Sequence, residues 1–312
     1  MSDREIICED LNLALDQFRL KGFRLDVIYP ADAPHSALVS SEDETVLLTT
    51  RPGAPRPSGE LAPFNPEFVL TRACADAGTG RAGMQYRDLI PSRLGGRYIA
   101  SHIKIPRGGP VADWVHYHRI AFQLIVVRSG WVRVVYEDQG EPFVMEAGDM
   151  VLQPPEIRHR VLESSAKLEV VEITCPALHE TLADHDMCLP NGQLDLNRSF
   201  GGQRFLRHVA KETPWVSIDG GESQGTSIRN ATAGLADAQI IKSGGSPVIE
   251  FPGHDGELGF GFVLDGSAEL EFEGLHRLEP ADSFVIPPNQ PWVLHNASAD
   301  FLLLHVTTSR LG

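Results

Sequence analysis

The feature that most constrains this fold is an internal repeat of short β-type segments. VVRSGWVRVVYED (residues 126–138) recurs as FVLDGSAELEFEG (262–274), and EAGDMVLQPPEIRH (146–159) recurs as EPADSFVIPPNQPW (279–292). The offset stays at about 133–136 residues, and self-similarity at a nearly fixed offset indicates one structural unit present twice. The sequence therefore predicts a tandem of two similar units.

Both copies consist of β-branched or aromatic runs separated by turn residues at intervals of about ten. Such spacing is typical of an all-β sandwich or barrel. Runs that we expect to be strands in the first copy are RYIASHIKI (97–105), AFQLIVV (121–127), WVRVVYED (131–138), PFVME (142–146), MVLQ (150–153), RHRVLE (158–163) and LEVVEIT (168–174). We expect a short helix over 178–186 to close the first copy. The predicted boundaries are 1–57 for an extension, 58–190 for the first barrel and 191–312 for the second.

The N-terminal extension carries a different pattern. Residues 9–20 have leucines at helical spacing, FRLDVIYP that follows is typical of a strand, and SALVSSEDETVLLTT predicts a hairpin. Residues 51–67 hold five prolines, which predicts a linker. The order helix, strand, hairpin resembles, weakly, half of a glyoxalase-like module, notably in GFRLDVIYPADAP, although it supplies no obvious ligand set.

Charge and cysteine content exclude several classes of function. The chain has 42 acidic and 27 basic side chains, a formal charge of −15, which disfavours nucleic acid and anionic membranes as partners. The four cysteines are far apart with no C-x-x-C pair, so we expect reduced thiols. The N-terminus lacks the pattern of a signal peptide and no apolar run reaches a bilayer's ~20 residues. We expect a cytoplasmic protein.

Candidate metal ligands gather in the first copy. His116 and His118 flank Tyr117 in an extended segment, so their imidazoles point to one face of the chain, about 7 Å apart along the backbone. Gln123 and His159 are the third and fourth candidates. Imidazole suits Fe, Mn, Zn, Ni and Cu alike, and such a set leaves coordination positions for water or substrate. A lone H-x-H pair carries little information, but this combination keeps its register over 44 residues.

The spacing of these residues resembles the two signature motifs of the cupin superfamily. The first motif is Gly109, His116, His118, Gln123 and Gly130, and the second is Gly148, Asp149, Pro154, Pro155 and His159. The resemblance implies two tandem jelly-roll (double-stranded β-helix) barrels. It also implies one divalent transition metal (Fe, Mn, Zn or Ni) held by His116, His118, Gln123 and His159.

This sequence departs from the cupin pattern at three positions. Gln123 replaces the usual Glu, Glu156 replaces a common Gly, and the leading glycine is displaced by one residue. A neutral amide would leave the ion a stronger Lewis acid than a carboxylate does. The alternative is that Gln123 does not ligate, which leaves a three-histidine site similar to those of some ring-cleaving cupin dioxygenases.

Other candidate site residues flank the motifs. Tyr98, Ala100, His102 and Lys104 share one face of a predicted strand. If that face looks inward, Tyr98 and His102 are candidate catalytic residues and Lys104 a substrate-binding one; the competing interpretation is a solvated outer face. Gln153 and Arg158 are further substrate-binding candidates. Arg158 would hold a substrate carboxylate or form a surface ion pair.

The second copy lacks the ligand pattern. The four ligand positions project onto Pro252, His254, Gly259 and Trp292, of which only the histidine can bind a transition metal. We therefore expect a structural second barrel, in which Trp292 fills the space of a metal. Its apolar strands suit an interface, and the cupin resemblance implies a homodimer.

Three functions remain open at this stage. The first is an Fe(II) dioxygenase acting on a small organic substrate. The second is a non-oxidative lyase, isomerase or hydrolase that uses Mn, Zn or Ni as a Lewis acid. The third is a non-catalytic bicupin that binds a small ligand.

Overall fold

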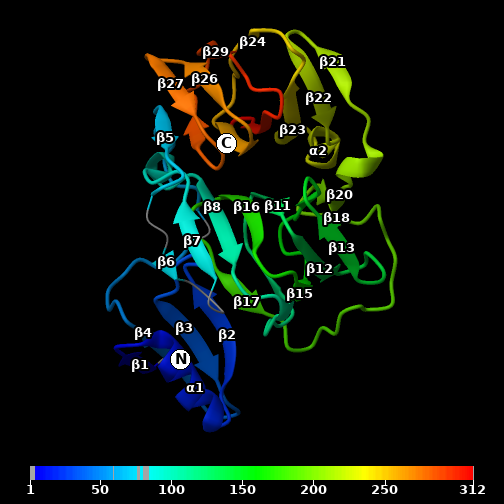
Figure 1. The fold of residues 1–312 in the computed structure, drawn as a ribbon. Helices are drawn as coiled ribbons and strands as arrows, with labels where there is room; N and C mark the ends of the chain where they lie inside the picture. The colour runs from blue at the N-terminus through cyan, green and yellow to red at the C-terminus, as the bar shows by residue number, and fades with distance from the viewer. Residues whose placement is uncertain (1–3, 59, 76–77, 80–83, 312) are drawn as a thin grey trace.

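The computed structural model describes residues 4–58, 60–75, 78–79 and 84–311. Figure 1 shows three parts in succession, the N-terminal extension in blue, the first barrel in cyan and green, and the second barrel in yellow to red. The architecture is all-β, with two tandem jelly-roll barrels as the repeat predicts. No described helix is long and apolar enough to cross a membrane.

The N-terminal extension has the predicted order of elements. Its helix α1 (Leu11–Leu20) is capped by Asp10, whose side chain accepts a 2.9 Å hydrogen bond from the Leu13 amide. The helix packs on a sheet of β1 (Arg4–Ile7), β2 (Arg24–Tyr29), β3 (Ser36–Ser40) and β4 (Thr45–Thr49). The described residues of the predicted linker contain no helix or strand.

The first barrel consists of two facing sheets. The first sheet contains β9 (Gly109–Pro110), β10 (His116–Tyr117), β12 (Trp131–Tyr136), β13 (Phe143–Glu146), β15 (His159–Ser164) and β17 (Thr181–Ala183). The second contains β6 (Gly78–Thr79), β7 (Gln85–Asp88), β8 (Ile99–Ile105), β11 (Phe122–Ser129), β14 (Met150–Leu152), β16 (Leu168–Cys175) and β20 (Leu206–His208). Apolar side chains from both sheets fill much of the space between them.

The segment predicted as a short helix is a strand. Within 178–186, β17 pairs with β10 of the barrel on one side and with β2 of the extension on the other. Two neighbouring strands offer this backbone a full set of hydrogen bonds, which outweighs the weak local preference for a helix. The extension therefore continues a sheet of the first barrel.

The second barrel repeats this architecture. Its first sheet contains β21 (Val216–Ile218), β22 (Gly221–Gly225), β23 (Ala236–Ser243), β25 (Gly259–Asp265), β28 (Ser283–Val285) and β30 (Leu302–Thr308). Its second sheet contains β24 (Val248–Phe251), β26 (Ala268–Glu271), β27 (Leu275–Leu278) and β29 (Trp292–His295). The hairpin β18 (Ser199–Phe200) and β19 (Gln203–Arg204), the helix α2 (Ile228–Ala231), and the short 3₁₀ turns η2 (Arg93–Gly95) and η3 (Ala210–Glu212) complete the fold.

Strands are exchanged between the two barrels. β5 (Val69–Thr71), from the predicted first barrel, pairs with β28 of the second, whereas β20, from the predicted second barrel, pairs with β14 of the first. Figure 1 shows β5 beside the second barrel. The predicted boundaries at 58 and 191 follow the repeat in the sequence, but each predicted barrel contributes a strand to a sheet of the other.

The two barrels share one apolar core. It joins side chains of β8, β11 and β16 to those of β23, β25 and β30. A buried ion pair crosses this contact, in which the Arg97 guanidinium lies 2.7 Å from the Glu257 carboxylate. The shared core fixes the outer face of β8 against the second barrel, which decides the location of several candidate residues below.

Candidate metal centre

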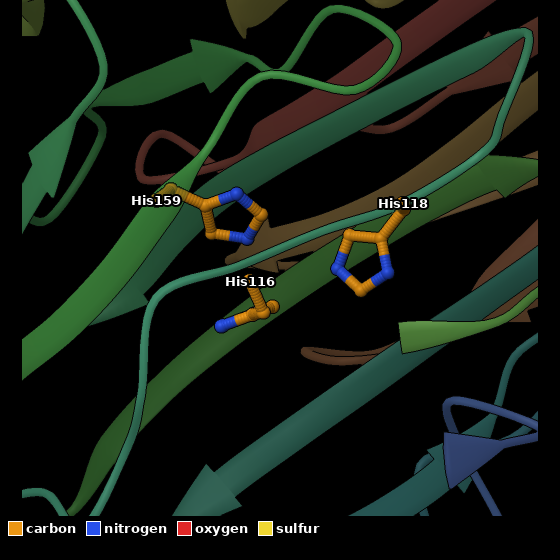
Figure 2. Close-up of side chains that lie close together, drawn as sticks. All are labelled: His116, His118 and His159. Carbon is orange, nitrogen blue, oxygen red and sulfur yellow. The ribbon is translucent and has the colours of Figure 1, made fainter. Parts of the chain in front are cut away.

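Three histidines converge inside the first barrel. His116 and His159 are directly opposite each other on the paired strands β10 and β15, and their ring centroids are 4.2 Å apart. The His118 ring lies 5.4 Å from each of the other two. One nitrogen from each residue lies within 4.8 Å of the others, and all three side chains are buried. Figure 2 shows the three rings facing a common space.

Hydrogen bonds to the backbone orient each imidazole. Nδ1 of every histidine in the cluster lies 2.8–3.0 Å from a main-chain carbonyl oxygen, to which it donates. The proton therefore resides on Nδ1, and the lone pair is on Nε2. This is how proteins orient metal-ligating histidines. The carbonyls belong to Trp114, Glu180 and Ile157, which contact His116, His118 and His159 respectively.

A chain of neutral polar groups extends from the cluster. The Gln153 amide nitrogen donates to Gln123 Oε1 at 2.7 Å and lies 3.3 Å from His159 Nε2. The Tyr136 hydroxyl donates to Gln153 Oε1 at 2.6 Å. Burial raises the pKa of Tyr136, so this phenol stays protonated and keeps donating. Gln123 thus lies at the site with its amide oxygen held by Gln153.

The cluster lines a cavity of about 120 Å³. For comparison, an engineered apolar cavity of about 150 Å³ in another protein binds benzene. Most of the wall is apolar, with contributions from Met84, Ile99, Ile103, Ile105, Ile125, Val132, Val134, Met145, Val161, Leu168 and Val170. Such a cavity fits a small, mostly apolar organic molecule.

One carboxylate of this cavity was not anticipated. Glu172 lines the wall together with Leu168 and Val170 of the same strand, β16. It lies close enough to Tyr136 to contribute to the raised pKa of that phenol. Period-two alternation along LEVVEIT places Leu168, Val170 and Glu172 on one face. A charged residue on an otherwise apolar face was therefore the signal available in the sequence.

Other polar residues of the wall also lie outside both motifs, among them His179, Asp32 and Arg160. His179 precedes β17, is 2% exposed, and its ring centroid is 5.5 Å from that of His118. Asp32 belongs to the N-terminal extension, between β2 and β3. The sequence contexts of His179 and Asp32 show no ligand pattern, because only the pairing of β17 with β2 brings them to the first barrel.

Three predicted site residues, two on β8 and one just before it, lie away from the cavity. The strand directs Ile99, Ile103 and Ile105 inward, so Tyr98, His102 and Lys104 face outward. The Tyr98 hydroxyl lies 2.7 Å from that of Thr308 in the second barrel. The sequence left open whether this face looks inward or is solvated, and for Tyr98 and His102 neither holds because the shared core between the barrels is a second buried environment.

His102 is part of an ionic cluster between the barrels. Its Nε2 lies 2.7 Å from the Glu169 carboxylate and its Nδ1 3.1 Å from Arg87. Burial, with Arg87, lowers the pKa of His102 to about 4. Lys104 is half-exposed and lies 3.8 Å from the same carboxylate. These contacts assign His102 and Lys104 to the packing of the two barrels.

Arg158 also lies outside the cavity. Its Nε donates to Asp184 at 2.9 Å, and its guanidinium stacks 4.1 Å above the ring of Tyr117. This corresponds to the surface pair that the sequence left as one alternative. Arg158 is not among the residues that line the cavity. Of the substrate-binding candidates, only Gln153 is at the site.

The second barrel is packed where the first is open. The Trp292 ring stacks on Phe251 at 3.7 Å and is 3% exposed. Since Phe251 pairs with Trp292 as His116 pairs with His159, Phe251 rather than Pro252 occupies the first ligand position. His254 matches His118, but its Nε2 contacts the Ile286 carbonyl at 2.9 Å.

Comparisons with known proteins agree with this architecture. Residues 101–174 match the cupin domain family. One similar solved structure is oxalate decarboxylase from Bacillus subtilis at pH 4.6, with 10% identity and a TM-score of 0.56 over 82% of this chain and 80% of that one. Another is Lactobacillus farciminis oxalate decarboxylase in a formate complex, with 12% identity and a TM-score of 0.57 over 82% of this chain and 89% of that one. A third is a putative glyoxylate-induced protein from Pseudomonas aeruginosa, with 12% identity and a TM-score of 0.57 over 82% of this chain and 94% of that one. No curated protein sequence gives a significant match.

Proposed function

Since the first barrel is a cupin domain within a bicupin fold, we propose that the chain is a metal-dependent enzyme acting on a small organic substrate. His116, His118 and His159 would hold one divalent transition ion, Fe, Mn, Zn or Ni. The observation that carries the proposal is the convergence of three Nδ1-anchored imidazoles in the wall of a mostly apolar cavity. A purely structural barrel needs neither feature, and the second barrel has neither among its described residues.

The residues of the chain fit such an ion. The lone pairs of the three Nε2 atoms are fixed by backbone hydrogen bonds, as a metal site requires. When bound, the ion supplies Lewis acidity to the oxygen atoms of a chelating substrate and, if it is iron, redox chemistry with O₂. Gln123 is the candidate fourth ligand, through a neutral amide.

The remaining cavity residues would position the substrate and move a proton. The aliphatic wall makes the surroundings of the substrate less polar than water, which strengthens the polar contacts inside. Gln153, held by Tyr136, orients Gln123 toward the cluster. Glu172 takes the role of proton acceptor that the sequence had given to His102 or Tyr98, since it is the carboxylate on the inward face of β16.

Oxygen-dependent cleavage is the leading reaction. Three neutral imidazoles leave the full charge of the ion available for an anionic, bidentate substrate, with a neighbouring position for O₂. A non-oxidative lyase or isomerase is the second candidate. It is favoured by the neutral Gln123 and by the similar structures of two oxalate decarboxylases.

The test combines metal analysis with oxygen measurement. Protein purified without added metal should contain about one transition ion per chain, and the His118→Ala variant should contain much less. With candidate enediols, catechols and hydroxy acids, a dioxygenase consumes O₂ in step with substrate loss, whereas a lyase turns over equally well without O₂. Unchanged metal content in His118→Ala would remove the basis of both reactions and leave a ligand-binding bicupin.

Two further expectations from the sequence stay predictions. Light scattering on the purified protein tests the expected homodimer. Localisation of the tagged full-length chain in cells tests the cytoplasmic assignment.

A further inference from the structure

Three buried polar atoms of residues in the wall of the metal-site cavity have no hydrogen-bond partner among the described residues. They are Nε2 of His179, Oδ1 of Asp32 and Nε of Arg160. A buried polar atom left unsatisfied costs about 1–3 kcal/mol, so native proteins seldom keep one without a reason. Several such atoms in the wall of one cavity indicate a site for a hydrogen-bonding group.

The contacts of the rest of each side chain make the atoms of His179 and Asp32 acceptors. Nδ1 of His179 donates to the Pro176 carbonyl at 3.1 Å, which leaves the lone pair on Nε2. The other oxygen of Asp32, Oδ2, lies 2.8 Å from the Arg93 guanidinium, with which it forms an ion pair.

The two residues approach each other from different parts of the molecule. His179 lies just before β17, and Asp32 lies just after β2, which is the strand that pairs with β17. Both residues line the same cavity. The N-terminal extension thus completes the wall of the cavity beside His118, and has a role beyond packing.

We propose that His179 and Asp32 form a subsite that binds a hydrogen-bond donor, a hydroxyl or amino group, of a substrate held at the metal centre. The inference rests on the proposed function and names its substrate class. The substrate would be a short molecule with a chelating end, an apolar part matching the aliphatic wall, and a hydroxyl or amino group that reaches the wall beside His118.

Matched pairs of hydroxamates can test this, since a hydroxamate chelates a transition ion through two oxygens. Each pair compares an alkyl chain with one whose terminal methyl is replaced by hydroxyl, namely propiono- against glycolo-, butyro- against 3-hydroxypropiono-, and valero- against 4-hydroxybutyrohydroxamate. The protein would be loaded with Co(II), and dissociation constants would be measured from the change in the visible cobalt spectrum. The quantity compared is the dissociation constant of the alkyl member divided by that of the hydroxyl member.

We expect this ratio to be about tenfold higher in the wild-type protein than in His179→Phe or Asp32→Ala for at least one chain length, because one charge-assisted hydrogen bond is worth about that factor. The control variants His185→Phe and Asp26→Ala change surface residues that do not line the cavity, and they should keep the wild-type ratio. The two test variants lie on separate elements, so misfolding of one leaves the other informative.

The outcomes separate the two proposals. If Co(II) binds but the ratio is the same in the wild type and both variants for every pair, the subsite is wrong and the metal site stands. In that case, a structural water satisfies the atoms of His179 and Asp32. If Co(II) does not bind to the wild-type protein, the proposed function itself fails.

Discussion

The two barrels of this chain share a fold and differ in what fills them. In the first, three imidazoles and a chain of amides border an open cavity; in the second, Phe251 and Trp292 stack in the corresponding place. Backbone hydrogen bonds establish the equivalence. Gln153 N donates to Gln123 O as Ile286 N donates to Gly259 O, and Glu156 N donates to His118 O as Asn289 N donates to His254 O.

The matched histidines show how such a site is lost. His118 donates to a carbonyl through Nδ1 and directs Nε2 toward the cluster, whereas His254 directs Nε2 itself to the Ile286 carbonyl. Gly259 makes this orientation possible, since a Cβ there would lie 2.4 Å from the His254 ring. A side chain such as Gln123 in the first barrel excludes it. Retaining a histidine therefore does not retain its ligating atom.

The largest expected effect is on the stability of the filled barrel. Trp292→Ala would remove a ring that is 3% exposed and stacked on Phe251, and should lower the free energy of unfolding by about 3–5 kcal/mol. Urea unfolding measures this loss of free energy, and the metal content of the variant should equal that of the wild type. A loss below about 1 kcal/mol would mean that the ring does not serve as core.

Acid should destabilise the second barrel through His305. Burial, with His254, lowers the pKa of His305 to about 4, against an ordinary value of 6.5. Below pH 6.5 the unfolded chain binds a proton that the folded chain does not bind until about pH 4, so stability falls over that window. This group contributes about 3 kcal/mol to the loss. His305→Gln should make the free energy of unfolding less dependent on pH between pH 7 and 4, as measured by urea unfolding. An unchanged pH dependence would contradict the assignment of this loss of stability to His305.

Removing a ligand should affect only the first barrel. His159→Ala should weaken metal affinity at least about 100-fold, or about 2.7 kcal/mol, because one of three fixed imidazoles is lost. His254→Ala in the second barrel is the control and should bind metal as the wild type does. Competition with a chromophoric chelator measures both, and equal losses in the two variants would contradict the assignment of the site to one barrel.

The smallest effect concerns the residue in which this site departs from the cupin pattern. Gln123→Glu should tighten metal binding about tenfold, because a carboxylate adds charge while its oxygen still accepts from Gln153. Gln239→Glu makes the same change in the second barrel, away from the cavity, and should have no effect on affinity. If Gln123→Glu also leaves affinity unchanged, position 123 does not ligate and the site is one of three histidines.

Much of the fold was predictable because the relevant signals are local. Alternating apolar residues and turn residues predict the strands from Ile99 to Cys175 within a few positions. The 178–186 segment was mispredicted as a helix because it is a strand only through pairing with β2 and β10. Likewise, alternation separated Tyr98, His102 and Lys104 from their neighbours on β8 but could not show which face looks inward, since both faces are buried.

The sequence by itself determined the duplication, the all-β class and the histidines that converge in the first barrel, because each depends on spacing along the chain. Only the tertiary structure decided the rest. It turned β8 toward the second barrel, brought Glu172 and His179 to the cavity wall, and placed Asp32 of the extension beside them. The physical reason is that these positions depend on pairing and packing between segments far apart in the chain, and a single sequence carries no local record of such contacts.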